Sequence, residues 1–196
     1  MLAAVILAAG ESSRMGSPKA VLPFQGRPFL GHLLDITRHA AKSEIGEIRV
    51  VLGPHAEQIM SALALEPEIV VHNPNWEQGQ LSSIQTAIRS LPEGATDGMI
   101  LFLVDHPLIS VLLVSKLIAE FRRSGLPIAV PTFHGKRGHP VIFAARLYEE
   151  LLGAPLEQGA RAVVWAHATE VLEVPTDEEG VLLNLNDPDA LREALG

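Results

Sequence analysis

Cysteine is absent from the 196-residue chain, which excludes disulfides, thiolate metal ligands and cysteine nucleophiles. Basic residues are also scarce, since 15 Lys and Arg stand against 23 Asp and Glu and the formal net charge is -8. A chain with this balance offers no basic face to nucleic acid. We therefore expect a protein of a reducing cytoplasm that does not bind nucleic acid.

Long hydrophobic runs are lacking as well. The N-terminal segment MLAAVILAAG is apolar, but no charged residues precede it and its apolar run ends at Gly10. It is too short for a membrane span and lacks the charged start of a signal peptide, so a buried strand explains it better. Hydrophobic residues make up 47% of the chain, which is enough for a sizeable core. We expect one domain over residues 1–196 and no membrane segment.

Short apolar runs alternate along the chain with stretches of helical periodicity. This alternation predicts an α/β fold, a three-layer α/β/α sandwich around a mostly parallel, Rossmann-like sheet. The predicted strands cover residues 3–8, 48–52, 68–72, 99–104, 127–131, 140–144, 170–174 and 181–185. The predicted helices lie around residues 30–37, 55–64, 81–90, 111–123, 145–152 and 159–167, with a last one starting at Asp187.

The loop after the first strand, from Leu7 to Lys19, carries the strongest functional pattern. Ligands of doubly wound sheets sit at the carboxyl ends of strands, and this loop leaves such an end. Small residues at positions 8–10 let backbone N–H groups approach a base or a phosphate, and Arg14 and Lys19 supply two cations for a triphosphate. The spacing matches neither a Walker A loop nor the dinucleotide fingerprint. A solvated loop with incidental basic residues is the alternative.

Asp105 closes the most apolar predicted strand, residues 99–104. A carboxylate at the tip of a buried strand is costly unless a partner satisfies it. A hydrated Mg²⁺ that bridges to phosphates would do so, because this ion prefers one or two carboxylates together with phosphate oxygens. The alternative is a cap on the following helix.

Two further loops offer polar groups. Asn75, Gly79, Ser82 and Ser83 lie before and at the start of a predicted helix, where hydroxyls and amides suit a ribose or a base edge. A helix cap by one of the two serines is the alternative. In the loop 132–139, His134 and His139 suggest a zinc pair, but no third ligand stands at a sensible spacing, and a hydrogen-bonded loop histidine is the plain alternative.

The segment Leu-Ala-Ala-Gly-Glu-Ser-Ser-Arg-Met-Gly-Ser-Pro-Lys, residues 7–19, resembles the motif of the MobA-like NTP transferases. Its opening is most similar to the molybdopterin cytidylyltransferase branch. The resemblance implies a fold of the nucleotide-diphospho-sugar transferase type, with Lys19 nearest the reacting α-phosphate and Arg14 on the triphosphate. It also implies a nucleotide-binding loop that includes Leu7, Ala8, Ala9, Gly10 and Gly16.

The same resemblance extends to other positions. Val-Asp-x-Pro is where related enzymes hold magnesium, which implies Asp105 as a metal ligand. The family's second ligand is an Asp near the C-terminus; here Asn186 stands at that position, an amide without charge, and Asp187 is one residue away. The expected acceptor-binding residues are His106, Gly138, His139, Pro140 and Arg161. For Arg161, a position on a solvated helix face is the alternative.

Together these patterns predict a Mg²⁺-dependent nucleotidyltransferase in which Arg14, Lys19 and Asp105 are catalytic. It transfers NMP, with CTP favoured as donor, to a small phosphorylated acceptor such as molybdopterin and releases pyrophosphate. Cytidylyl transfer to methylerythritol phosphate and nucleotidyl transfer to a sugar phosphate are the enzyme alternatives. The remaining alternative is a nucleotide-binding chaperone or sensor, and a molybdoenzyme is then the partner protein to consider.

Overall fold

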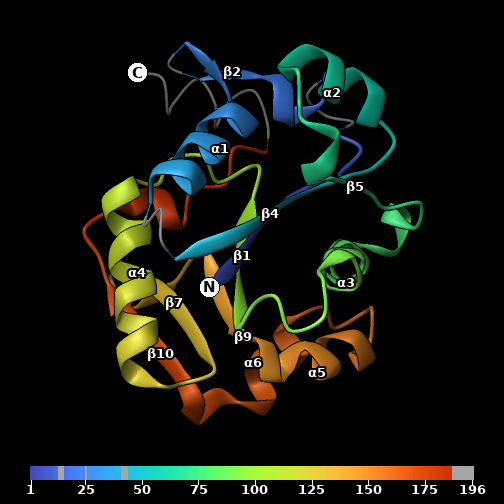
Figure 1. Ribbon diagram of the computed structural model, residues 1–196. Helices are drawn as coiled ribbons and strands as arrows, with labels where there is room; N and C mark the ends of the chain where they lie inside the picture. The colour runs from blue at the N-terminus through green and yellow to red at the C-terminus, as the bar shows by residue number, and fades with distance from the viewer. Residues whose placement is uncertain (13–15, 25, 41–43, 187–196) are drawn as a thin grey trace.

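A mixed, mostly parallel sheet forms the centre of the protein in the computed structural model, which describes residues 1–12, 16–24, 26–40 and 44–186 (Figure 1). The strands follow one another across the sheet in the order β10-β7-β9-β6-β1-β4-β5, and β8 pairs with β7. Their bounds are β1 Leu2–Ala8, β4 Ile45–Leu52, β5 Val70–His72, β6 Gly98–Leu103, β7 Ile128–Phe133, β8 Lys136–Arg137, β9 Val141–Ala144 and β10 Val171–Pro175. A separate small hairpin joins β2, Pro23–Phe24, to β3, Arg27–Pro28.

Helices cover both faces of this sheet, so the predicted three-layer α/β/α architecture is confirmed. Apolar residues of α1, α2 and α4 pack on one face, and those of α3, α5 and α6 pack on the other. The helix bounds are α1 Phe29–His39, α2 Ala56–Leu63, α3 Gln80–Ser90, α4 Val111–Ser124, α5 Tyr148–Gly153 and α6 Arg161–Ala166. Short 3₁₀ turns cover Lys19–Val21, Pro67–Ile69, Trp76–Gln78, Ala145–Leu147, Ala168–Glu170 and Glu179–Val181.

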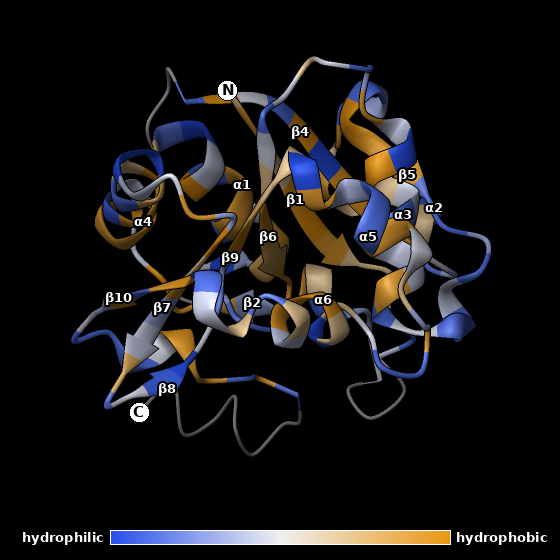
Figure 2. Ribbon diagram, turned by 90° about the horizontal axis from the view of Figure 1, so that it is seen from below, coloured by the Kyte–Doolittle hydropathy of each residue, from blue (hydrophilic) through white to orange (hydrophobic). Residues whose placement is uncertain are grey.

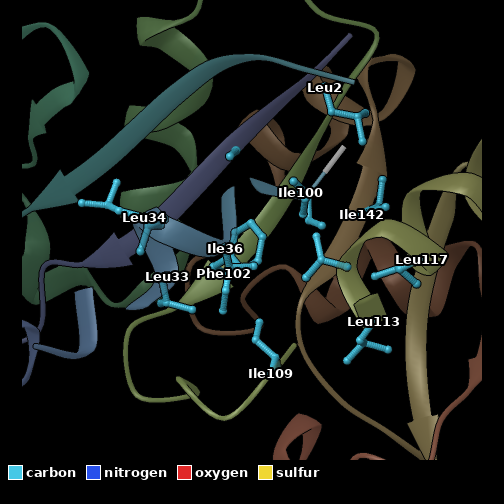
Figure 3. Packing of buried hydrophobic residues seen from close by; sticks show 14 of the residues in the cluster. Leu2, Leu33, Leu34, Ile36, Ile100, Phe102, Ile109, Leu113, Leu117 and Ile142 are labelled. Atoms are coloured by element: carbon cyan, nitrogen blue, oxygen red, sulfur yellow. The ribbon is translucent and has the colours of Figure 1, made fainter. Parts of the chain in front are cut away.

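The central strand β1 is apolar at every position because it is buried on both faces. Successive side chains alternate between the two cores: Ile6 joins the core under α1 and α4, whereas Leu7 joins the core under α3. Figure 3 shows the first core, where leucines of α1 and α4 surround Ile100 and Phe102 of β6. In Figure 2 the central β1 carries the hydrophobic colours, while β8 at the margin is hydrophilic.

Two features of the sheet differ from the sequence prediction. Residues 181–185 do not form a strand, because their backbone bonds to loops: Val181 O accepts from His139 N, and Leu185 N donates to Asp105 O. The strand β9 runs antiparallel between β6 and β7, a direction that apolar periodicity alone does not reveal. The helix predicted from Asp187 lies outside the described residues.

The register of the two central strands places the candidate site. β1 and β6 are parallel neighbours, with Leu7 opposite Leu103, so the loops that follow them leave the same edge of the sheet. The loop with Lys19 and the loop with Asp105 therefore start side by side. Among the described residues, none of the helices has both the length and the apolar character needed to span a bilayer.

Candidate functional site

The backbone that leaves β1 forms one wall of a cavity of about 230 Å³. Leu7, Ala8, Ala9 and Gly10 line it, as the sequence analysis predicted for a nucleotide-binding loop. The residue after β4 must be a glycine here because the two chains come very close: a Cβ on Gly53 would lie 2.3 Å from Ala9 O. The chain after β1 is thus held against the end of β4.

Lys19 places a positive charge near the carboxyl end of β6. Its backbone N–H donates to Ser12 Oγ at 3.1 Å, which fixes the start of the turn Lys19–Val21. Its side chain lines the same cavity as Leu7, and its Nζ lies 3.4 Å from Asp105 Oδ2. Both side chains are largely shielded, at 15% and 20% exposure, so the ion pair is screened less than a surface pair.

Asn186 completes this polar cluster. Its Oδ1 accepts a hydrogen bond from Lys19 Nζ, so one ammonium group bonds to two oxygens that come from distant parts of the sequence. The structure thereby brings together Lys19 and Asp105, which the residue pattern predicted as site residues, and Asn186, which was predicted only through the resemblance. Arg14 lies outside the described residues, and Gly16, at φ +66°, does not line the cavity.

The donor set around Lys19 Nζ suits a hard divalent cation. One carboxylate oxygen and one amide oxygen already converge on a positive charge, and oxygen donors are what Mg²⁺ prefers. Across the part of the chain that the structure describes, no cluster of three or more His, Cys, Asp or Glu could hold a metal alone. A magnesium ion here would thus complete its shell with water and phosphate oxygens. For the same reason the zinc pair suggested by His134 and His139 finds no third ligand in the described residues.

Asp105 does not cap the helix that follows it. The N-cap of α4 is Ser110, whose Oγ accepts from Leu113 N at 3.0 Å. Ser110 therefore fills the capping role that was the alternative for Asp105, and the carboxylate of Asp105 faces the cavity instead.

The loop before α3 forms the opposite wall. Asn73 is buried and its Nδ2 donates to the hydroxyls of Ser82 and Ser83, while Ser82 Oγ donates to the carbonyls of Asn75 and Gly79. Neither serine caps the helix. Of the four predicted residues here, Gly79 and Ser83 line the cavity, whereas Ser82 and Asn75 hold the loop together from behind.

A second cavity, of about 430 Å³, lies beside the first. Its floor is apolar and includes Val130, Val141 and Phe143 of the sheet, and the predicted acceptor residues Gly138, His139 and Arg161 line it. His106 and Pro140 do not line it. Gln80, the first residue of α3, lines both cavities.

Two histidines lie next to each other, and one of them, His139, lines the second cavity. The rings of His106 and His139 are 5.0 Å apart, and the buried Nδ1 atom of each has no hydrogen-bond partner among the described residues. Burial lowers the pKa of His139 to about 4, with a smaller contribution from His106. Burial also lowers the pKa of His106, against the opposing effect of Asp105. Both imidazoles are therefore neutral near pH 7 and can bond to a ligand without adding charge.

The guanidinium of Arg161 is oriented before any ligand binds. Its Nε donates to Gln158 O at 2.8 Å, and its Cζ lies 5.8 Å from the centroid of the Trp165 ring, within cation–π range. The solvated helix face was the alternative for Arg161; the side chain is exposed, yet it also borders the second cavity. Other residues that line the two cavities were not among the predicted site residues: Ser12, Trp76, Gln80, Arg137 and Gln158.

A C-terminal strap, residues 178–186, packs against the loops that contain Asp105 and His139. Glu178 accepts from the N–H and the hydroxyl of Ser110, at 2.9 and 2.5 Å. Gly180 packs so closely that a Cβ would lie 1.6 Å from Leu108 O, and a Cβ on Gly138 would lie 2.4 Å from Val181 O. At the end of the strap, Asn186 accepts a hydrogen bond from Lys19 Nζ. The predicted strand over residues 181–185 is thus replaced by a segment that builds the site.

Known proteins resemble this chain over 73% to 99% of its length. It is 27% identical to the molybdenum cofactor cytidylyltransferase of Escherichia coli K12, over 94% of this chain and 91% of that protein. It is 30% identical to the nicotine blue oxidoreductase of Paenarthrobacter nicotinovorans, over 73% of this chain and 71% of that protein. Among solved structures, Rv0371c of Mycobacterium tuberculosis H37Rv has a TM-score of 0.85 at 27% identity, covering 99% of this chain and 97% of that one. A manganese complex of Rv0371c has a TM-score of 0.74 at 25% identity, covering 99% of this chain and 97% of that one.

A family model covers most of the chain. Residues 4–171 match the MobA-like NTP transferase domain, a span that includes the loop after β1, Asp105 and the histidine pair. The resemblance inferred from residues 7–19 is thereby confirmed, and so is the fold type. The chain belongs to the MobA-like NTP transferase family and is a nucleotidyltransferase.

Proposed function

We propose that the protein transfers the NMP unit of an NTP, with CTP favoured, to a small phosphorylated acceptor such as molybdopterin, in a Mg²⁺-dependent reaction that releases pyrophosphate. The observation that carries the proposal is the convergence of Lys19, Asp105 and Asn186 at the edge of the cavity lined by residues 7–10. Similarity to a molybdenum cofactor cytidylyltransferase supports the choice of CTP and of a pterin acceptor.

The first cavity suits the nucleotide. Backbone amides at residues 8–10 approach the base and ribose, and the Ser83 hydroxyl adds a donor from the opposite wall. Lys19 holds the α-phosphate and, with Arg14, balances the charge that passes to the leaving pyrophosphate. Magnesium, held by Asp105 and Asn186 when bound, would polarise the phosphates and neutralise part of their charge.

The second cavity suits a flat, mostly apolar acceptor with an anionic group. Its floor can pack against a heterocycle, and Arg161 at the rim offers the planar donors that match a phosphate or another oxyanion. His139 lines this cavity as a neutral imidazole, and the ring of His106 lies 5.0 Å from it.

The transfer reaction, where the two cavities meet, depends more on positioning of the acceptor phosphate than on a general base. A phosphomonoester has a second pKa of about 6, so it is mostly dianionic at pH 7 and can attack without losing a proton. One of its oxygens forms a bond to the α-phosphorus, while the bond from that phosphorus to the bridging oxygen breaks and pyrophosphate leaves with the electron pair. His139, whose pKa is about 4, would be a weak base for a hydroxyl acceptor, which favours a phosphate.

A two-stage assay tests the proposal. First, thermal unfolding is followed with CTP, GTP, ATP and UTP, each with Mg²⁺; a ligand at 100 times its Kd should add about 2.7 kcal/mol of stability. Second, pyrophosphate release from the best nucleotide is measured with molybdopterin, methylerythritol phosphate or a sugar 1-phosphate. We expect CTP to stabilise most and molybdopterin to support release. Turnover with either other acceptor alone would refute the proposed acceptor and leave the nucleotidyl transfer intact.

A further inference from the structure

The most unusual feature of the cluster is that a protein cation occupies the point on which the two metal-ligand candidates converge. Lys19 Nζ bonds to both Asp105 and Asn186. These are the oxygens that a divalent ion would need. Before a nucleotide binds, the charge of the carboxylate is therefore already balanced inside the protein.

A divalent ion meets two obstacles in this arrangement. It must displace an ammonium group from oxygens that it requires, and it must do so beside a like charge in a region that is largely shielded from water. The described part of the chain supplies no third acidic or histidine ligand to offset this cost. Metal binding to the nucleotide-free protein should accordingly be weak.

A bound triphosphate can draw the Lys19 ammonium group away from Asp105 and Asn186 without any movement of the backbone. The main chain of Lys19 is anchored by its N–H bond to Ser12 Oγ and by the turn Lys19–Val21, so only the side chain has to rotate. Phosphate oxygens in the cavity offer the ammonium new partners of higher charge. Rotation toward them would leave the oxygens of Asp105 and Asn186 free, and the same phosphates would supply the missing metal ligands.

We infer that Lys19 is an internal counterion that keeps divalent metal out of the site until a nucleotide draws it away. Metal and nucleotide then bind as a coupled pair, and each raises the affinity for the other by the same factor. This inference rests on the proposed function for the identity of the nucleotide. It goes beyond that function because it assigns Lys19 a second role, which is exerted before any chemistry takes place.

The experiment measures metal binding by the full chain without turnover. Free Mn²⁺ is followed by electron paramagnetic resonance during titration of the nucleotide-free wild type, Lys19→Met and the matched control Lys116→Met. Lys116 is an exposed lysine of α4 that donates to Pro175 O and touches neither cavity. We expect Lys19→Met to bind Mn²⁺ at least about tenfold more tightly than the wild type, and Lys116→Met to match the wild type.

A double variant locates the ion. Adding Asp105→Asn to Lys19→Met should abolish the gain if the ion sits on the carboxylate of Asp105. Thermal unfolding of every variant checks that the fold is retained. Binding of Mn²⁺ by Lys19→Met that is no tighter than in the wild type would overturn the inference, and so would a gain that persists in the double variant. The proposed function fails by a different result, the absence of pyrophosphate release from wild-type protein.

Discussion

The two cavities of this protein are built on opposite principles. In the first cavity, proposed for the nucleotide, the charged and polar side chains already have partners: Lys19 holds Asp105 and Asn186, and Asn73 holds Ser82 and Ser83. The floor of the second cavity, proposed for the acceptor, is apolar, and the Nδ1 atom of its lining residue His139 has no hydrogen-bond partner among the described residues. The first site must exchange internal bonds for ligand bonds, whereas the second mainly gains bonds. Side-chain changes should therefore alter nucleotide chemistry strongly and acceptor binding by smaller steps.

The largest effect is expected on the nucleotide side. Lys19→Ala removes the cation beside the α-phosphate, and loss of one such stabilising group lowers kcat/KM by roughly 10²–10³-fold. Pyrophosphate release with CTP, Mg²⁺ and acceptor measures it. Lys116→Ala is the control, since it removes an exposed lysine of α4 and should leave the rate unchanged. Near wild-type turnover by Lys19→Ala would end the assignment of this cavity to the nucleotide.

The next effect concerns the strap, residues 178–186, that brings Asn186 to Lys19. Gly180→Ala would place a Cβ 1.6 Å from Leu108 O, so backbone must move and the free energy of unfolding should fall by about 3 kcal/mol. Denaturant unfolding measures the loss. Gly153→Ala is the control, because a Cβ added to this last residue of α5 would meet no atom within 4 Å, and the stability should hardly change. Equal stability of both variants would show that the strap is not tightly packed.

The nucleotide cavity was largely foreseeable from the sequence, and the acceptor cavity much less so. Residues 7–10 and Lys19 lie at the end of β1 and in the loop after it, Asp105 lies just after β6, and parallel neighbours bring such loops to one edge. Asn186 could be placed only through the family resemblance, because its path depends on close packing of Gly180 rather than on periodicity. The second cavity is assembled from distant segments, so a lining residue such as Arg137 carries no local signal.

The acceptor side should respond to pH. The pKa of His139 is about 4 in the folded protein, against about 6.5 when unfolded, so the unfolded chain binds the proton more readily between these values. Stability should therefore be highest above about pH 6.5 and fall as the pH drops toward about 4. Allowing for the part of the ring that water reaches, the loss is about 2 kcal/mol. His106, whose pKa burial also lowers, acts in the same direction.

Denaturant unfolding across this pH range, in wild type and His139→Gln, measures the effect. The glutamine variant cannot take up the proton, so its stability should vary less with pH than that of the wild type. Parallel pH profiles for the two proteins would contradict the assignment of the acid sensitivity to His139.

The smallest effect should arise where the two cavities meet. Gln80 borders both, at the first turn of α3, and its amide can donate to one ligand while accepting from another. Gln80→Leu keeps the size of the side chain and removes this bridge. A neutral hydrogen bond contributes about 0.5–1.5 kcal/mol, so KM for the acceptor should rise by about threefold to tenfold, with a smaller change in the affinity for CTP. Gln78→Leu is the matched control, because Gln78 is exposed and lines neither cavity. If the two variants gave the same acceptor KM, Gln80 would not link the two ligands, and the two cavities would be independent at the wall that they share.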